Sequence, residues 1–401
     1  MIKIFLNRTS IIVFINLIFA YNSFSQPTEM IRAEALFQLG EYKESAAIFN
    51  TLDSRKSWFK KRLVEANWNA GNYKKALKMI SELRSLDKGF GYFYGARYYV
   101  KQNNLDSAFV MLEKMLAARY KPNRSSVKTD SVLKALKLEP QWDSLWKLPH
   151  YSEYDLKVEM AAQELSVQNY DLALQLLDEL IEDRSYKDKP WFLRSKLLYE
   201  QGFYKTALDD IDMAINEEDR EAVYYGFRAE VYLKLDKSKK AFKDAIKAIE
   251  LADYDPRWYE IAARAGIAME KFEEVAPYAE IYLAAMPEKD NAHFYNASII
   301  YKTGSCMKAL PHINKAIALE DRNPTYYFLR AQIYQSCKVF KQAIKDYNMC
   351  LDFWPRKAEI YLGRGICRHE LGETKQSCRD LWKAYDLGSL KADDLRREWC
   401  N

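Results

Sequence analysis

The chain has 401 residues, enough for two or three ordinary domains or for one long solenoid. Hydrophobic residues make up 49% and charged residues 29%, as in globular rather than disordered chains, and 13 Gly with 11 Pro are too few for a β-sandwich or barrel of this length. The net charge of +5 is spread along the chain, without the basic stripe that nucleic-acid binding requires.

Residues 1–25 are predicted to be a secretory signal peptide. Lys3 and Arg8 give a basic start, residues 11–20 are almost wholly apolar, and small residues precede Gln26, where we expect cleavage. A membrane anchor is the alternative. It is disfavoured because ten helical residues rise only about 15 Å, against the ~30 Å of a bilayer core. No later segment of the sequence is suited to span a membrane.

Residues 26–118 contain three loosely similar segments. Each has a turn, at Gly40, Gly71 or Asn103, which leads into an apolar stretch with helical periodicity. We therefore expect about three helix pairs in this block.

Residues 119–150 interrupt this pattern as an irregular insert. Pro122, Pro140 and Pro149 prevent a full helix pair there. A short helix over 130–138 and a compact turn around 142–146 are expected instead.

Residues 151–388 are strictly periodic, with a small residue marking each unit at a spacing of 34 residues. Ahead of each marker lies an aromatic-rich helix and a tight turn, and the marker opens a second helix with apolar residues on one face. The seven markers are Ala173, Ala207, Ala241, Val275, Ala309, Ala343 and Ser377. The period predicts seven helix pairs, followed by a capping helix near residues 389–401.

The period and its contents resemble the tetratricopeptide repeat family. In that family a bulky residue early in the first helix is followed, four positions later, by a small one that lets two helices cross closely. The pairs are Trp191 with Ser195, Tyr225 with Ala229, Tyr259 with Ala263, His293 with Ala297, Tyr327 with Ala331 and Tyr361 with Gly365. The resemblance implies an all-α, right-handed superhelical solenoid of helix-turn-helix repeats over nearly the whole chain after residue 25.

Ion pairs are written into the regular units. Four units carry Arg in the first helix and Asp sixteen residues later, namely Arg194 with Asp210, Arg228 with Asp244, Arg330 with Asp346, and Arg364 with Asp380. The other three units lack both residues. Pairing between neighbouring units would serve only Asp210 with Arg228 and Asp346 with Arg364, so we predict structural pairs within each unit rather than a site for an acidic partner.

All six cysteines lie between residues 306 and 400, and in an exported chain they can form disulfides. Residues equally far from a turn lie side by side in antiparallel helices, which favours Cys306 with Cys337 and Cys378 with Cys400. Cys350 and Cys367 remain, as a further pair or as free thiols. Cys367 with Cys378 is a competing arrangement.

The catalytic inventory is thin. No HExxH, GxSxG, P-loop or dinucleotide-binding glycine motif occurs, and no CxxC spacing suggests a metal site. The four histidines are dispersed, and His293 stands where other units have Trp or Tyr, so packing explains it better than ligation. We expect no enzyme activity, no cofactor and no metal.

The remaining candidate is a binding surface. In the resembled family the first helices line a concave face that commonly holds a peptide, and the candidates on that face are Phe192, Lys196, Tyr199, Arg257, Arg264, Tyr301 and Gln332. The signal end and the cysteine-bearing last repeat resemble exported Bacteroidetes repeat proteins. We therefore expect a protein-binding scaffold in the periplasm or at the surface of a Gram-negative cell, perhaps peripherally on a membrane. The alternative is a glycan-binding or hydrolase-accessory protein that uses Trp142 and Trp146 of the insert as a sugar platform.

Overall fold

The computed structural model describes residues 28–147, 149–183 and 188–400, and these residues form helices joined by turns, with no strand among them. They divide into two compact units, unit 1 ending at Trp258 and unit 2 beginning at Tyr259. The predicted signal peptide lies outside the described residues. None of the described helices combines the length and the hydropathy that crossing a membrane requires.

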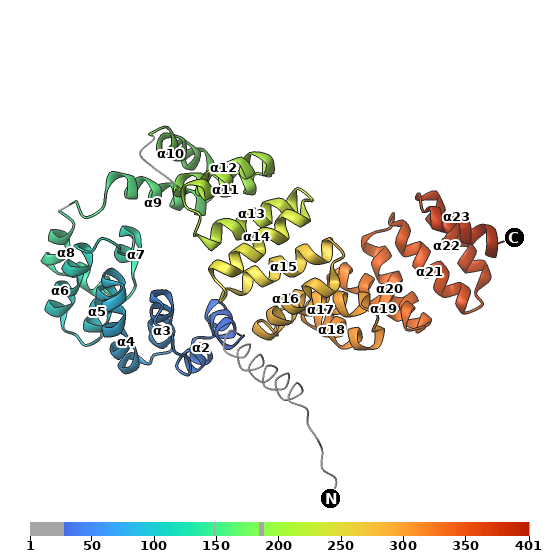
Figure 1. The fold of residues 1–401 in the computed structure, drawn as a ribbon, viewed down its shortest axis with the longest axis horizontal. Coiled ribbons are helices and arrows are strands. Elements are labelled where there is room, and N and C mark those ends of the chain that lie inside the picture. Colours follow the sequence, from blue (N-terminus) through green and yellow to red (C-terminus); the bar gives the residue numbers. More distant parts are fainter. Residues whose placement is uncertain (1–27, 148, 184–187, 401) are drawn as a thin grey trace, which may run out of the picture. The chain divides into compact units, whose positions relative to one another are not determined.

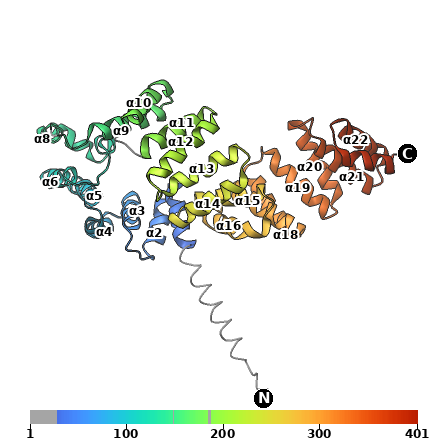
Figure 2. The same cartoon turned by 45° about the horizontal axis from the view of Figure 1, so that its top comes forward.

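Unit 1 consists of antiparallel helix pairs, visible as successive hairpins in Figures 1 and 2. The pairs before the insert are residues 28–38 with α2 (Tyr42–Phe49), α3 (Ser57–Asn69) with α4 (Tyr73–Leu86), and α5 (Lys88–Lys101) with α6 (Leu105–Leu116). The pairs after it are α9 (Glu153–Ser166) with α10 (Tyr170–Glu182), α11 (Asp188–Glu200) with α12 (Tyr204–Glu217), and α13 (Ala222–Lys234) with α14 (Ser238–Leu251). This architecture confirms the predicted all-α solenoid of helix-turn-helix repeats.

The insert is more helical than the sequence suggests. It contains α7 (Arg124–Thr129), a 3₁₀ helix η1 (Leu133–Leu138) and α8 (Pro140–Leu145), so the expected helix over 130–138 is shorter and the expected turn at 142–146 lies largely in α8. Pro140 occupies the first turn of α8, where its fixed φ favours a helix start. The apolar side chains of the insert join the core beneath α5 and α6, which explains why the insert does not separate two units.

The second unit continues the same pattern. Helix α15 (Pro256–Ala268) crosses the boundary, and the remaining helices are α16 (Phe272–Ala285), α17 (Asp290–Lys302), α18 (Cys306–Leu319), α19 (Pro324–Ser336), α20 (Phe340–Phe353), α21 (Ala358–Glu370) and α22 (Thr374–Asp386). A final helix, α23 (Leu390–Trp399), packs on α22 where the sequence predicts a cap.

The period is visible in the backbone as well. One residue in the turn of each regular pair has a positive φ, between 55° and 105°, and these residues are also 34 apart: Gln168, Gly202, Asp236, Glu270, Gly304, Lys338 and Gly372. Glycine adopts this conformation without steric cost, whereas the other side chains do so at some cost. The tight turn is thus imposed by the repeat geometry even where the sequence does not supply glycine.

The core of each hairpin is the crossing of two small residues. All seven marker residues are completely buried. Where one of the crossing residues is Ser, its hydroxyl donates to the backbone carbonyl opposite, as from Ser195 to Ala207 at 2.6 Å and from Ser377 to Gly365 at 2.8 Å. A side chain larger than Ala or Ser would hold the two helices apart.

Each of the four arginines forms the predicted two-pronged contact with the aspartate of its own hairpin. In the first of these pairs the Nε and Nη2 atoms of Arg194 lie 2.8 and 2.9 Å from the carboxylate oxygens of Asp210, and the other three pairs repeat this arrangement at 2.6–2.9 Å. The aspartates are only 3–5% exposed. The hydrogen bond from Asp210 also raises the pKa of Arg194.

The sequence analysis missed a second bond of each arginine, which does link neighbouring hairpins. The Nη1 atom donates to a side chain sixteen residues earlier, in the second helix of the preceding hairpin, at 2.7–3.0 Å. The acceptors are Asp178, Asp212, Asn314 and Asn348. The comparison in the sequence considered only the aspartates already used within each hairpin. Each guanidinium therefore fixes both the hairpin and its junction to the previous one.

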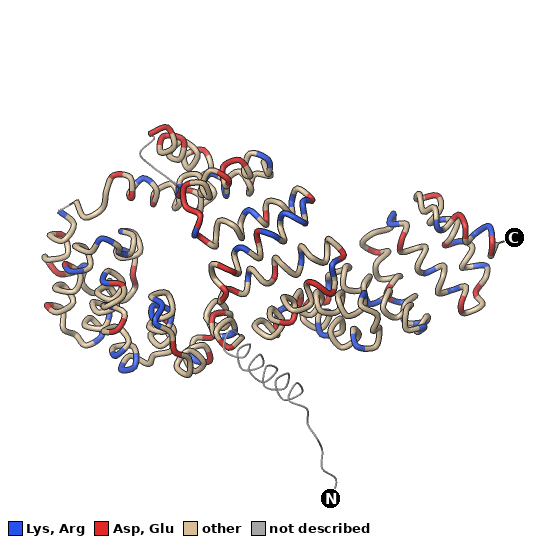
Figure 3. Tube along the Cα trace, viewed as in Figure 1, with Lys and Arg blue, Asp and Glu red and all other residues tan. Residues whose placement is uncertain are grey.

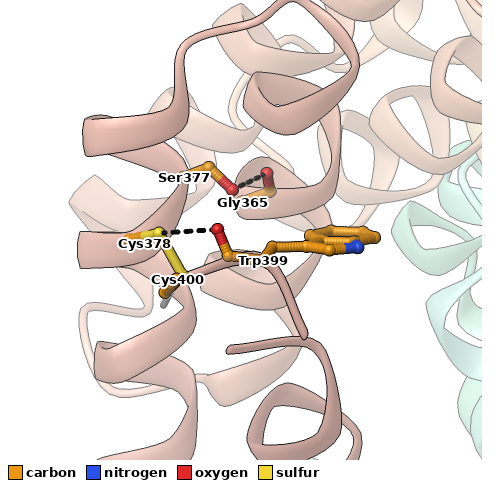
Figure 4. Close-up of a disulfide and its surroundings, with 5 residues drawn as sticks. All are labelled: Gly365, Ser377, Cys378, Trp399 and Cys400. Atoms are coloured by element: carbon orange, nitrogen blue, oxygen red, sulfur yellow. Dashed lines mark hydrogen bonds between the residues drawn. A yellow bond between two sulfur atoms is a disulfide. The ribbon is translucent and has the colours of Figure 1, made fainter. Parts of the chain in front are cut away.

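Two disulfides join Cys306 to Cys337 and Cys378 to Cys400, the pairs that the sequence favours. The second one ties α23 to α22, and Trp399 beside it stacks on His369 with ring centroids 3.7 Å apart (Figure 4). Cys350 and Cys367 are free and buried, and burial raises the pKa of both thiols to about 12. Among the described residues these two thiols are inert core side chains.

The buried ion pairs give a testable prediction. Replacement Asp210→Ala leaves Arg194 without its buried partner and should lower the free energy of unfolding by about 3–5 kcal/mol. Replacing both residues by Leu should cost less, because no unpaired charge remains. Urea denaturation of the three variants measures the difference.

Asp209→Ala is the matched control, because Asp209 is the exposed neighbour of Asp210 and its loss should change stability by no more than about 0.5 kcal/mol. Strictly additive losses for the two single changes would contradict the pairing.

Candidate functional site

The first helices of unit 1 line two adjoining cavities, which together we call the inner groove. The larger cavity has a volume of about 840 Å³ and lies among the α6–α7 connection, α9, α11 and the start of α13. The smaller one, of about 660 Å³, lies between residues 28–38 and the α13–α15 segment. Glu221 and Val223 line both cavities, so the two are continuous along the wall formed by α13.

The wall of the larger cavity is rich in aromatic side chains. Its aromatic lining residues are Phe90, Tyr120, Tyr151, Tyr154, Phe192 and Tyr224. Several are held by hydrogen bonds, as Tyr151 donates to the carbonyl of Pro122 at 2.8 Å and Tyr224 to Asp188 at 2.6 Å. Burial raises the pKa of both phenols, so they remain protonated donors. These rings are fixed in place before any ligand arrives.

Charged groups in the larger cavity are balanced, and most are already engaged. Lys121 donates to the carbonyls of Leu116 and Ala118, and Glu159 accepts from the backbone of Ser125. Figure 3 likewise shows Lys and Arg interspersed with Asp and Glu along the helices. The groove therefore offers apolar and aromatic surface with a few polar groups, as ligand pockets commonly do.

The smaller cavity is closed on one side by contacts between distant segments of unit 1. The ring of Trp58 stacks on Tyr254 with centroids 3.5 Å apart. Behind this stack Glu34, only 2% exposed, accepts hydrogen bonds from Arg62 at 2.7 and 2.9 Å. Burial raises the pKa of the Glu34 carboxyl, and Arg62 offsets part of this rise.

The seven predicted surface residues are distributed among several places. Phe192 lines the larger cavity and Arg257 the smaller one, while Tyr301 and Gln332 line a separate cavity of about 380 Å³ in unit 2. Lys196 and Tyr199 lie beside Phe192 on α11 without lining these cavities, and Arg264 pairs with Glu260 at 3.6 Å. The structure therefore brings only Phe192 and Arg257 to the inner groove.

The sequence reasoning missed most of the groove, although the period contains the necessary signal. Asp155, Lys189, Val223 and Arg257 are successive equivalents 34 residues apart, and all four line the groove. Projecting Arg257 backward by whole periods would have found the other three. Phe90 and Tyr151 could not be found this way, because they lie in and before the insert, where the period is broken.

The groove lacks the usual catalytic groups. Among its described lining residues there is no His, Cys, Ser or Thr side chain that could act as a nucleophile or a histidine base. In the described part of the chain no three His, Cys, Asp or Glu side chains gather as a metal centre. The arrangement is suited to binding an extended segment.

Comparison with known proteins places the chain among repeat proteins. No family model matches it. It is 25% identical over 198 residues to Hsp70-Hsp90 organizing protein 1 of Glycine max, covering 47% of this chain and 34% of that protein, and thus spans about a third of that relative's length. It is 31% identical over 80 residues to the TPR repeat-containing thioredoxin TDX of Arabidopsis thaliana, covering 20% of this chain and 21% of that protein.

Among solved structures, a chain of the APC/C hetero-tetramer Cut9-Hcn1 aligns with a TM-score of 0.50 and 12% identity, over 92% of this chain and 89% of that one. This likeness concerns the fold alone. Together with the 34-residue period, the small-residue crossings and the sequence relatives, it shows that the chain is a tetratricopeptide-type repeat protein.

Proposed function

We propose that the protein is a non-catalytic scaffold that holds a segment of a partner protein in the inner groove of unit 1. The observation that carries this proposal is the groove itself, about 840 and 660 Å³ of continuous space walled by fixed aromatic rings. Preformed apolar surface lowers the ordering cost of binding, and aromatic side chains contribute strongly at interfaces.

The relatives support a scaffold role in general terms. The soybean protein is named for organizing two other proteins, Hsp70 and Hsp90. Because the match spans only about a third of that protein, its partners are not carried over to this chain. What the comparison supports is the binding of protein segments by stacked helix pairs.

We further propose that the protein works in the cell envelope of a Gram-negative bacterium, in the periplasm or at the surface. The support is the basic, apolar and small-residue order of residues 1–25, together with the two disulfides, which persist in oxidising compartments. Reduced cytosolic conditions would not maintain such bonds.

The glycan-binding alternative has less support. The Trp142 side chain is 6% exposed and packs in the core of unit 1, and Trp146 meets it edge-on with Lys128 4.8 Å above its ring. A sugar platform needs an exposed ring face, and Trp142 offers none.

The scaffold proposal predicts that Val223→Asp abolishes capture of the partner. Val223 is 37% exposed and lines both cavities, so a carboxylate there places charge in the groove while costing the fold little. The measurement is in-cell crosslinking and affinity purification, followed by quantitative mass spectrometry. The wild-type partner should fall at least about tenfold, which corresponds to about 1.4 kcal/mol of binding free energy.

Val110→Asp is the matched control, since Val110 is 43% exposed on the second helix α6 and lines neither cavity. It should leave capture unchanged. If both variants keep the partner, or both lose it, the inner groove is not the binding site.

The location is tested separately. Export predicts that the chain from the envelope fraction begins at Gln26, with an oxidised bond between Cys378 and Cys400. N-terminal sequencing and non-reducing peptide mapping measure both. An unprocessed chain that begins at Met1 in the cytosolic fraction would contradict the proposal.

A further inference from the structure

One repeat of unit 2 replaces the ion pair by histidines. In α17–α18 the positions of the clamp are occupied by Asn296 and His312 in place of Arg and Asp. Asn296 is 5% exposed and donates to the carbonyls of Ala279 and Ala292, both at 2.9 Å. His312 therefore has no arginine to hold, and its ring turns instead toward His293 on the facing helix.

The contact between the two rings joins Nδ1 to Nδ1 at 3.4 Å. The Nε2 atom of His293 lies 2.9 Å from the carbonyl oxygen of Pro287. A carbonyl oxygen only accepts, so Nε2 carries the proton and the Nδ1 of the neutral ring presents its lone pair to His312. A separation of 3.4 Å is long for a nitrogen-donor hydrogen bond, which prefers about 2.7–3.2 Å.

The same separation matches two ligands of one zinc ion. Histidine nitrogens bind Zn²⁺ at about 2.0–2.1 Å in tetrahedral geometry, which places two such nitrogens about 3.3–3.4 Å apart. The bond from His293 to Pro287 is also the kind that metal-ligating histidines make, since it fixes the ring and the tautomer. Both rings are half-buried, so water can reach the remaining coordination positions.

A carboxylate lies at the same edge of the repeat. Glu288 follows Pro287 directly, and its Oε2 lies 3.3 Å from Nζ of Lys315, one turn beyond His312 on α18. The charge of Glu288 is therefore close to the histidine pair and favours a cation there.

We propose that His293 and His312 bind one Zn²⁺ ion through their Nδ1 atoms, with water completing the coordination. The ion clamps α17 to α18 in a repeat that lacks the Arg–Asp pair. The site is a surface-accessible one with two protein ligands, and it is independent of the inner groove. It also corrects the expectation, from the sequence alone, that the chain holds no metal.

The proposal is tested by calorimetric titration of zinc chloride into protein free of a polyhistidine tag, at about pH 7.5 so that the imidazoles are largely neutral. One ion should bind per chain. His293→Tyr, which restores the residue found in neighbouring repeats, and His312→Asn should each weaken binding by on the order of 10–100-fold. Zinc should also raise the melting temperature of the wild type but of neither variant.

His150→Ala is the matched control, because His150 lies in the insert of unit 1 and binds the carbonyl of Leu145. It should leave zinc binding intact, and circular dichroism checks that all variants are folded. The absence of one-to-one binding, or binding that both variants retain, would overturn the site and leave a plain histidine contact. Failure of this site would leave the groove proposal untouched.

Discussion

The close crossing of two small residues in every hairpin is the constraint on which the rest of the structure depends. It sets the distance and angle between the helices of a pair, and the period of 34 residues repeats the same crossing along the chain. Every side chain at a given position of the period therefore has the same orientation relative to its hairpin. The turn residues at positive φ, the arginine contacts and the groove-facing positions all follow from this repetition.

The arginines add direction to this packing. Buried ion pairs contribute little net stability compared with apolar packing, because desolvation offsets the attraction between the charges. Their geometry is specific, however, since one guanidinium satisfies a carboxylate of its own hairpin and an acceptor of the previous one. A hairpin displaced by one helical turn would leave these buried charges unpaired. We infer that the pairs fix the register of stacking, while the small-residue crossings and apolar faces supply most of the stability.

The sequence predicts those features that depend on one repeat position at a time. The helix pairs, the Arg–Asp contacts and both disulfides are properties of equivalent or symmetric positions, so counting residues finds them. The inner groove is different, because its wall combines α9, α11 and α13 with the insert and with residues 28–38. Contacts such as Trp58 with Tyr254 join segments almost two hundred residues apart, and no spacing within a repeat encodes them.

The histidine pair shows the same limit in the opposite sense. Read one position at a time, His293 is an aromatic core substitute and His312 a missing aspartate. Their relation is visible only once the facing helices bring the two Nδ1 atoms together.

The central claim is that the repeat period determines which side chains face the partner. Photo-crosslinking residues placed singly at Asp155, Lys189 and Val223 test it directly, against exposed second-helix positions such as Asp209 and Lys243. The account predicts strong crosslinks to one partner segment from the three groove positions and weak ones from the second helices. Equal or stronger crosslinks from Asp209 and Lys243 would contradict it.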